Sequence, residues 1–260
     1  MIHFFRRIRK KLLSQTRFSK YLIYAIGEIF LVVIGILIAL SINNRNDRIK
    51  EKWIEKGLLI QLKDDLKTGD LSDIQTNFRI HTQLGQSLNT IIQWLESDSP
   101  MNDSLGNHFS IINRVSRFLQ TTSAYKTLEV EGIRFIKNDT LRNNLINYYE
   151  RTTNHYLQLE SEYHDLRWHM FKTLNSKHFK ASIELDVTKD WDGTTMTPNN
   201  AQKLKVDEEY LFFLKTMKYK NETFLIGFIK NHELTILSLL DQIERELASK
   251  RFENNNALFK

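Results

Sequence analysis

Apolar residues along this chain follow two patterns, one continuous run near the N-terminus and several helical stripes beyond it. The run covers residues 21–42, YLIYAIGEIFLVVIGILIALSI, and its one charged side chain is Glu28. A helix of this length spans roughly 33 Å, enough to cross the hydrocarbon core of a bilayer. The run therefore predicts a transmembrane helix over residues 21–43, with Tyr21 and Tyr24 near one membrane interface.

Two other interpretations of the run remain open. A cleaved signal peptide shares the basic start, but its apolar region is expected to hold only about 7–15 residues. Ala39-Leu40-Ser41 offers a weak cleavage site for it. A buried helix of a soluble protein would also be apolar, yet the flanking basic residues fit a membrane segment better.

After residue 43, apolar residues recur every three or four positions, which is the period of an amphipathic helix. Three long stripes show this period, over residues 74–95, 145–170 and 229–247, and shorter ones cover 109–118 and 124–131. The stretch from Arg45 to Trp94 has no proline and predicts an extended helix, with Gly57 and Gly69 as weak points. Strand-type alternation is scarce except around Ala181–Val187.

These patterns predict an all-α protein with one N-terminal transmembrane helix followed by an extramembrane helical bundle. The predicted parts are a basic amphipathic tail (1–20), the transmembrane helix (21–43), the bundle (44–252) and a C-terminal tail (253–260). Pro100 and Pro198 lie in polar stretches, so loops are expected near 97–107 and 175–206.

Charge is concentrated at the N-terminus. The 260 residues carry a formal charge of +6, but residues 1–20 alone hold seven Lys and Arg and no acidic residue. The remaining 240 residues are therefore almost neutral, which excludes a uniformly basic surface and any nucleic-acid partner. The absence of cysteine excludes disulfides, thiolate zinc sites and a cysteine nucleophile.

The basic tail and the flanks of the run set the expected location. Ile2, Phe5, Ile8 and Leu12 recur at helical spacing, so the tail can lie on the lipid bilayer as an amphipathic helix. A positive-inside signal without further role explains the tail equally well. The candidate membrane-surface residues are Arg6, Arg7, Arg9, Lys10 and Lys11. Seven basic residues precede the run and five follow it closely, which favours a cytoplasmic N-terminus and a periplasmic or extracellular C-terminal domain.

One face of the predicted transmembrane helix is a candidate contact surface for a partner membrane helix or a second copy of the chain. The face consists of Glu28, Val32, Gly35, Ala39 and Asn43. Gly35 and Ala39 form a small-xxx-small pair that permits close helix approach. A carboxylate at this depth is a candidate functional group by default. Alternatively, Glu28 reaches toward the lipid headgroups.

Catalytic and nucleotide-binding motifs such as GxSxG, Walker A, GxGxxG and HExxH are absent from the sequence. The best metal candidate is the group Glu160, His164, Asp165 and His169, but we expect these to be solvated charges on a helix face. A stripe of tyrosines at 149, 156 and 163 is expected in the core, with hydroxyls at the bundle edge. Its alternative role is to line a ligand pocket. We therefore predict no catalytic residue, no metal and no cofactor.

Several segments carry a resemblance to a known family. They are the opening Met1-Ile-His-Phe-Phe-Arg-Arg-Ile-Arg, the stretch from Phe18 to Asn44, Thr122-Ser-Ala-Tyr-Lys-Thr-Leu, Ile136-Lys-Asn-Asp, and Leu145-Ile-Asn-Tyr-Tyr-Glu150. With these segments the chain resembles domain of unknown function family 6090, small single-pass bacterial membrane proteins. The family usually has Trp where Arg45 stands. The resemblance implies a single-pass envelope protein with a helical domain and supplies no activity.

The function predicted from the sequence is a membrane-anchored, non-enzymatic interaction module of the cell envelope. The first alternative is a membrane-anchored ligand sensor that signals through a partner helix, because the cytoplasmic part of about 20 residues is too short for a signalling domain. A metal-dependent enzyme is the second alternative.

Overall fold

A computed structural model of the chain describes residues 17–180, 184–185, 194–249 and 252. Most of these residues are helical, and one long apolar N-terminal helix precedes the others, which confirms the all-α prediction. The chain divides into two compact units, residues 1–54 and 55–260, and each is described by itself.

The described part of the first unit belongs to helix α2 (Arg17–Asp64), which continues into the second unit. Its apolar side chains between Tyr21 and Ile42 are exposed or half-exposed, and Tyr21 is 78% exposed. Within the described residues, this is the one helix long and apolar enough to cross a membrane. Gly57 lies inside α2 without interrupting it.

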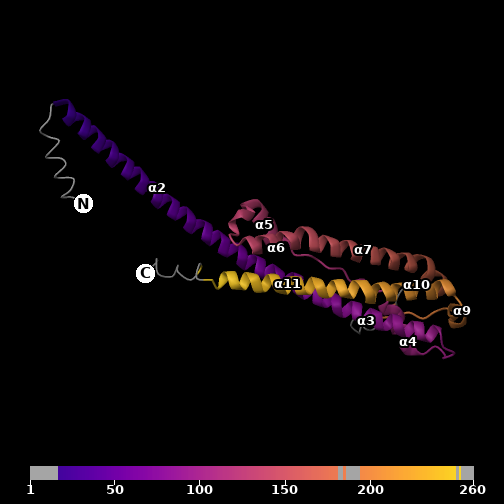
Figure 1. The fold of residues 1–260 in the computed structure, drawn as a ribbon. Helices are drawn as coiled ribbons and strands as arrows, with labels where there is room; N and C mark the ends of the chain where they lie inside the picture. Colours follow the sequence, from indigo (N-terminus) through magenta and orange to yellow (C-terminus); the bar gives the residue numbers. More distant parts are fainter. Residues whose placement is uncertain (1–16, 181–183, 186–193, 250–251, 253–260) are drawn as a thin grey trace. The chain divides into compact units, whose positions relative to one another are not determined.

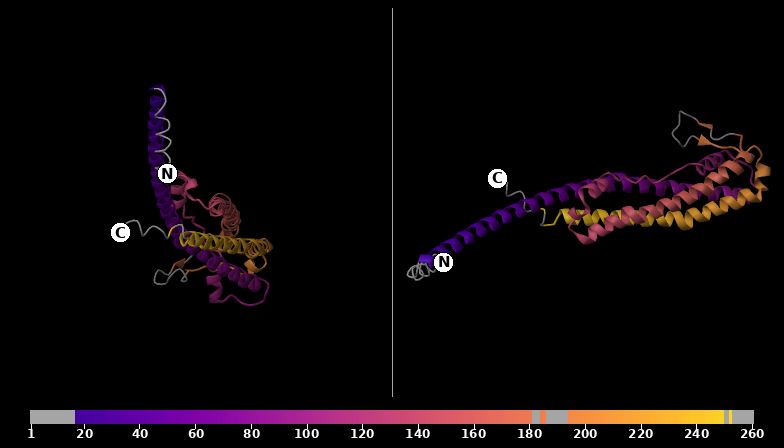
Figure 2. Two further views of the ribbon diagram at one scale, coloured as in Figure 1. Left: turned by 60° about the vertical axis from the view of Figure 1, so that its left-hand side comes forward. Right: turned by 90° about the horizontal axis from the view of Figure 1, so that it is seen from above.

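The second unit is built on three long helical runs that lie side by side (Figures 1 and 2). The first contains the end of α2, the π-helix η1 (Asp65–Leu71) and α3 (Ser72–Leu95). The second contains α6 (Asp139–Asn147), η3 (Tyr148–Thr152), α7 (Thr153–Met170), η4 (Phe171–Asn175) and α8 (Ser176–His178). The third contains α10 (Glu208–Tyr219), η6 (Lys220–Leu225) and α11 (Ile226–Leu247).

Shorter elements connect these runs. They are α4 (Asp103–Ile111), α5 (Ser123–Glu131), the 3-10 turn η2 (Ile133–Phe135) and α9 (Ala201–Lys205). Strands β1 (Glu184–Leu185) and β2 (Thr194–Thr195) form a two-residue antiparallel ribbon, and β1 lies inside the segment where alternation was expected. The rest of that segment, residues 181–183 and 186–187, lies outside the described residues.

Side-chain caps mark where several helices begin. Asn102, Asn138, Asn200 and Asp207 each accept a hydrogen bond from the backbone N–H three residues later. Such caps pair one of the N–H groups that the first helical turn leaves free. The expected loops near 97–107 and 175–206 therefore contain the short helical elements α4, α8 and α9.

The helix expected over residues 109–118 is confirmed only for residues 109–111 and is wrong beyond them. Helix α4 ends at Ile111, and residues 114–122 have no regular secondary structure. The cause is a set of carboxylates elsewhere in the chain that accept hydrogen bonds from the backbone N–H groups of Phe118, Leu119 and Thr121. The helix expected over 124–131 is confirmed as α5.

The core is the common face of the three runs. Ile74 and Leu88 of α3, Leu145 of α6, and Ile229 and Ile236 of α11 are completely buried. Each fully buried aliphatic side chain contributes roughly 1.5–3 kcal/mol relative to exposure in water. Burial of these predicted positions confirms the helical stripes as core faces.

Candidate functional site

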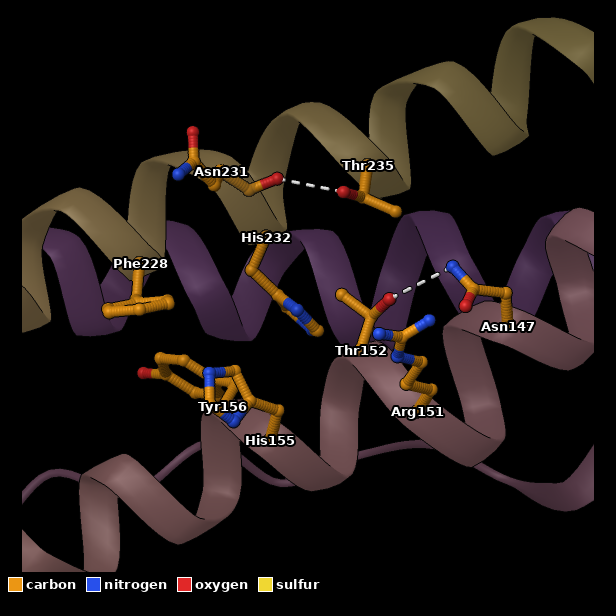
Figure 3. A pocket seen from close by; sticks show the side chains of 9 residues that line it. All are labelled: Asn147, Arg151, Thr152, His155, Tyr156, Phe228, Asn231, His232 and Thr235. Atoms are coloured by element: carbon orange, nitrogen blue, oxygen red, sulfur yellow. Dashed lines mark hydrogen bonds between the residues drawn. The ribbon is translucent and has the colours of Figure 1, made fainter.

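A pocket of about 530 Å³ opens between the second and third helical runs (Figure 3). Residues of α6, η3 and α7 form one wall, and residues of α11 form the other. Its lining consists of Asn147, Arg151, Thr152, His155, Tyr156, Phe228, Asn231, His232 and Thr235. The lining contains one arginine and two histidines but no carboxylate, so its formal charge is positive.

Several polar groups of the pocket have no protein partner. The guanidinium of Arg151 and the side-chain amide of Asn231 make no hydrogen bond or ion pair with another described residue. The two threonine hydroxyls are engaged: Thr152 accepts from the Asn147 amide at 3.3 Å, and Thr235 donates to the Asn231 carbonyl at 2.9 Å (Figure 3). The pocket therefore offers free donors on its rim.

His232 lies at the inner side of the pocket and is 2% exposed. Its ring stacks against Tyr156 at 5.1 Å between centroids and against Tyr148 at 5.3 Å, while Phe118 approaches it edge-on at 5.0 Å. Both ring nitrogens are buried without a hydrogen-bond partner in the described structure. Burial lowers the pKa of His232 to about 4, so the ring is neutral near pH 7.

The two tyrosines that stack on His232 connect it to buried carboxylates. Tyr148 donates its hydroxyl proton to Asp70, and Tyr156 donates to Glu160 at 3.2 Å. Burial raises the pKa of Glu160 to about 7 and also raises the pKa of Asp70. A buried aromatic and acidic cluster therefore lies behind the pocket.

The primary partners of these carboxylates are backbone N–H groups of the segment after α4. Phe118 N–H reaches both oxygens of Glu160, at 3.0 and 3.1 Å, and Thr121 N–H reaches Asp70 at 2.7 Å. The segment is not in a sheet, so its buried donors require other acceptors. We assign a structural role to Glu160 and Asp70, because each holds this segment against the long helices.

A second group of buried polar side chains surrounds Arg167 on α7. Arg167 is 7% exposed and makes no hydrogen bond or ion pair with any described residue. Burial lowers its pKa, and Arg117 lowers it further. The hydroxyl of neighbouring Tyr163 is also buried without a partner.

Two histidines close to Arg167 are held in defined orientations. His81 Nδ1 lies 2.9 Å from the Asn221 side-chain oxygen, and His164 Nε2 lies 2.8 Å from the Ser116 carbonyl. Both acceptors are oxygens, so these two nitrogens donate, and His81 Nε2 and His164 Nδ1 carry lone pairs without partners. Burial lowers the pKa of each to about 4.

The metal candidate group is not assembled. Asp165 and His169 are exposed, while Glu160 and His164 are buried, which corrects the expectation of four solvated charges. Within the residues that the structure describes, no three His, Asp or Glu side chains lie together as a metal site would need. Glu160 accepts a hydrogen bond from the Phe118 backbone N–H, and His164 donates one to the Ser116 carbonyl. These bonds hold both side chains in the interior.

The tyrosine stripe is core, as predicted, but its hydroxyls do not reach the bundle edge. Tyr149 and Tyr163 have buried hydroxyls without partners, and Tyr156 bonds to Glu160. Tyr156 also lines the pocket, and whether that pocket holds a ligand stays a prediction. Sequence reasoning missed Arg151 and Asn231, although His232 on an otherwise apolar stripe was a signal of a polar site nearby.

The predicted membrane face is on α2. Glu28, Val32, Gly35, Ala39 and Asn43 are all exposed in this chain, and Asn43 donates to Asp47 at 3.1 Å. Whether another helix covers that face stays a prediction. The candidate membrane-surface residues of the tail lie outside the described residues.

Comparison with known proteins gives one match. Residues 28–192, more than half of the chain, match the Family of unknown function (DUF6090). No curated protein and no solved structure matches the sequence.

Proposed function

We propose a function for this chain from the premise that it belongs to DUF6090, a family of unknown function. The chain is a single-pass membrane protein whose helical domain acts as a non-enzymatic interaction module outside the membrane. The observation that carries this proposal is the apolar segment of α2. Apart from Glu28 and Ser41, its side chains from Tyr21 to Ile42 are apolar or aromatic, and no described residue buries them. In water such a helix would be strongly unfavourable, whereas lipid solvates it.

Charge supports one orientation of this segment. Seven basic residues precede it and five follow it closely, so the N-terminus is cytoplasmic under the positive-inside rule. In this arrangement the inner membrane holds α2, the basic tail lies at the anionic inner leaflet, and the domain is periplasmic or extracellular.

The membrane face gives the interaction module a place to bind a partner helix or a second copy. Glu28, Gly35 and Ala39 lie on one side of α2, and a buried carboxylate gains from a polar partner in lipid. Replacing Glu28 with Leu should reduce the co-purification of that partner or the oligomer size in mild detergent. An unchanged oligomer and an unchanged set of co-purifying proteins would remove this part of the proposal.

The membrane assignment is tested by alkaline carbonate extraction of cell membranes. Wild-type chain should remain in the pellet. The variant Val33→Arg with Leu37→Arg should move to the supernatant, since each charge at the helix centre costs about 2.5–3.5 kcal/mol in insertion. The matched control, Val130→Arg with Val206→Arg, changes two residues that are 86% and 78% exposed on the domain and should stay in the pellet. Extraction of the wild-type chain would contradict the proposal.

A second candidate function, a ligand sensor, is favoured by the pocket beside His232. Ligand pockets typically have volumes of about 300–1,000 Å³ and combine apolar walls with a few convergent polar groups. The pocket has this size and both kinds of group. In a sensor, the domain would bind the ligand outside the membrane and a partner helix would carry the signal.

A further inference from the structure

We propose that the pocket beside His232 binds a small organic monocarboxylate with a flat apolar body. This inference rests on the second candidate function, the ligand sensor, and names the chemical class of its ligand. The proposal is carried by three features of the pocket: its charge, its apolar wall and its unpartnered nitrogens.

The charge of the lining selects an anion with a single charge. Arg151 is the one fully charged residue among those that line the pocket, and no carboxylate faces it there. Its guanidinium has no partner among the described residues, so it can form the two parallel hydrogen bonds that suit a carboxylate.

The apolar wall selects a flat body. Tyr156, Phe228 and His232 present rings to the pocket, and His155 contacts Phe228 edge-on at 5.5 Å. A flat ring of a ligand can stack on such groups with a gain beyond its buried area. Inorganic phosphate has no apolar surface and would leave this wall in contact with water.

The nitrogens of His232 supply the third feature. A neutral imidazole carries one N–H and one lone pair, and both lack a partner in the described structure although the ring is 98% buried. An unpaired buried polar group destabilises the folded state, and it is tolerated mostly where function requires the group. A carboxylate seated beside the ring would accept the N–H and remove that destabilisation.

The test uses the full-length chain in nanodiscs of zwitterionic phosphatidylcholine, titrated calorimetrically with phenylacetate. Phenylacetamide, with the same ring but no charge, and inorganic phosphate, with charge but no ring, are the comparison probes. Empty nanodiscs give the background from partition into lipid. We expect a dissociation constant for phenylacetate below about 1 mM and at least about tenfold weaker binding of both comparison probes.

Two variants assign the binding to this pocket. Arg151→Gln should weaken phenylacetate binding by about tenfold or more. The matched control Arg79→Gln changes another exposed arginine that has no partner within the described part of the chain, and it should leave binding unchanged. His232→Phe keeps an aromatic ring between the two tyrosines. It should weaken binding while leaving the thermal midpoint of the ligand-free protein unchanged or higher, because it removes two unpaired nitrogens.

Each other outcome overturns the proposal. Equal binding of phenylacetate and phenylacetamide would show that charge is not recognised, and equal binding of phosphate would show that the apolar wall is not used. Unchanged binding in Arg151→Gln would place the ligand elsewhere, and no binding up to about 10 mM would reject this ligand class. A failed titration leaves the membrane assignment untouched, because carbonate extraction tests that assignment separately.

Discussion

Glu160 shows how a single buried carboxylate can set the pH dependence of stability. Its pKa is raised from 4.5 to about 7 by burial, so between these values the folded chain holds a proton that the unfolded chain has lost. Its contribution to stability is therefore fully present below pH 4.5 and is lost as pH rises through about 7. His81, His164 and His232 act in the opposite direction, since their lowered pKa values stabilise the folded state above pH 6.5.

The variant Glu160→Gln isolates this effect, because the histidines are the same in both proteins. Glutamine cannot titrate, so the wild-type chain should exceed the variant in stability more at about pH 5 than at about pH 8. The difference in unfolding free energy between wild type and variant should change by about 2 kcal/mol from pH 5 to pH 8. Urea unfolding followed by circular dichroism measures it. Glu162→Gln, on the exposed side of α7, is the control and should show a constant difference; the same constancy in Glu160→Gln would contradict the pKa assignment.

At the scale of one element, the π-helix η1 is fixed by contact with the segment after α4. A Cβ on Gly69 would overlap the hydroxyl of Thr121 and lie 2.9 Å from its Cβ. Gly69→Ala should therefore destabilise the domain by about 1–3 kcal/mol through forced displacement of that segment. Differential scanning calorimetry of the full chain measures the change.

Gly57 provides the matched control for this prediction. It lies in the helical run that leads to η1, and a Cβ there meets nothing within 4 Å. Gly57→Ala should raise stability by up to about 1 kcal/mol from helix propensity alone. In a Thr121→Ala background, Gly69→Ala should lower the free energy of unfolding by less than it does in the wild-type chain. An equal cost in both backgrounds would show that the clash is not with Thr121.

The elements also show what the sequence can and cannot reveal. The three long stripes predicted the three helical runs, because the helix period is a local property. Residues 109–118 also have a helical period, yet Phe118 and its neighbours are extended because carboxylates 42 to 51 positions away, such as Glu160, bind their N–H groups. Contacts between residues so far apart leave no local signal.

The π turns explain a second difference, between the residues that the predicted stripe over 145–170 placed in the core and those that are buried there. Beyond η3, the predicted stripe placed Leu159 and Leu166 in the core, but both are only half-buried. Glu160 and Arg167 take the buried positions instead. A π turn contains an extra residue relative to an α turn, so the buried face shifts along the sequence. Tyr156, which the stripe placed in the core, also lines the pocket, so the sequence predicted one tyrosine of the lining.

At the scale of the whole molecule, the two proposals concern different parts of the chain. Membrane insertion depends on residues 21–42, whereas ligand binding depends on residues of η3, α7 and α11. A chain can therefore be inserted without binding the probe, and substitutions at Arg151 should not change its extraction. The two sets of residues do not overlap, so the variants of one test can serve as controls in the other.

The predicted topology, with the N-terminus in the cytoplasm, is simple to measure because the chain has no cysteine. Single-cysteine variants Ser14→Cys and Val206→Cys lie on opposite sides of the apolar segment, and Val206 is 78% exposed. With the N-terminus inside, a membrane-impermeant maleimide should label Val206→Cys in intact spheroplasts and Ser14→Cys only after permeabilisation. The wild-type chain should not be labelled in either case. The reverse pattern would place the domain in the cytoplasm, and its pocket would then meet cytoplasmic rather than external carboxylates.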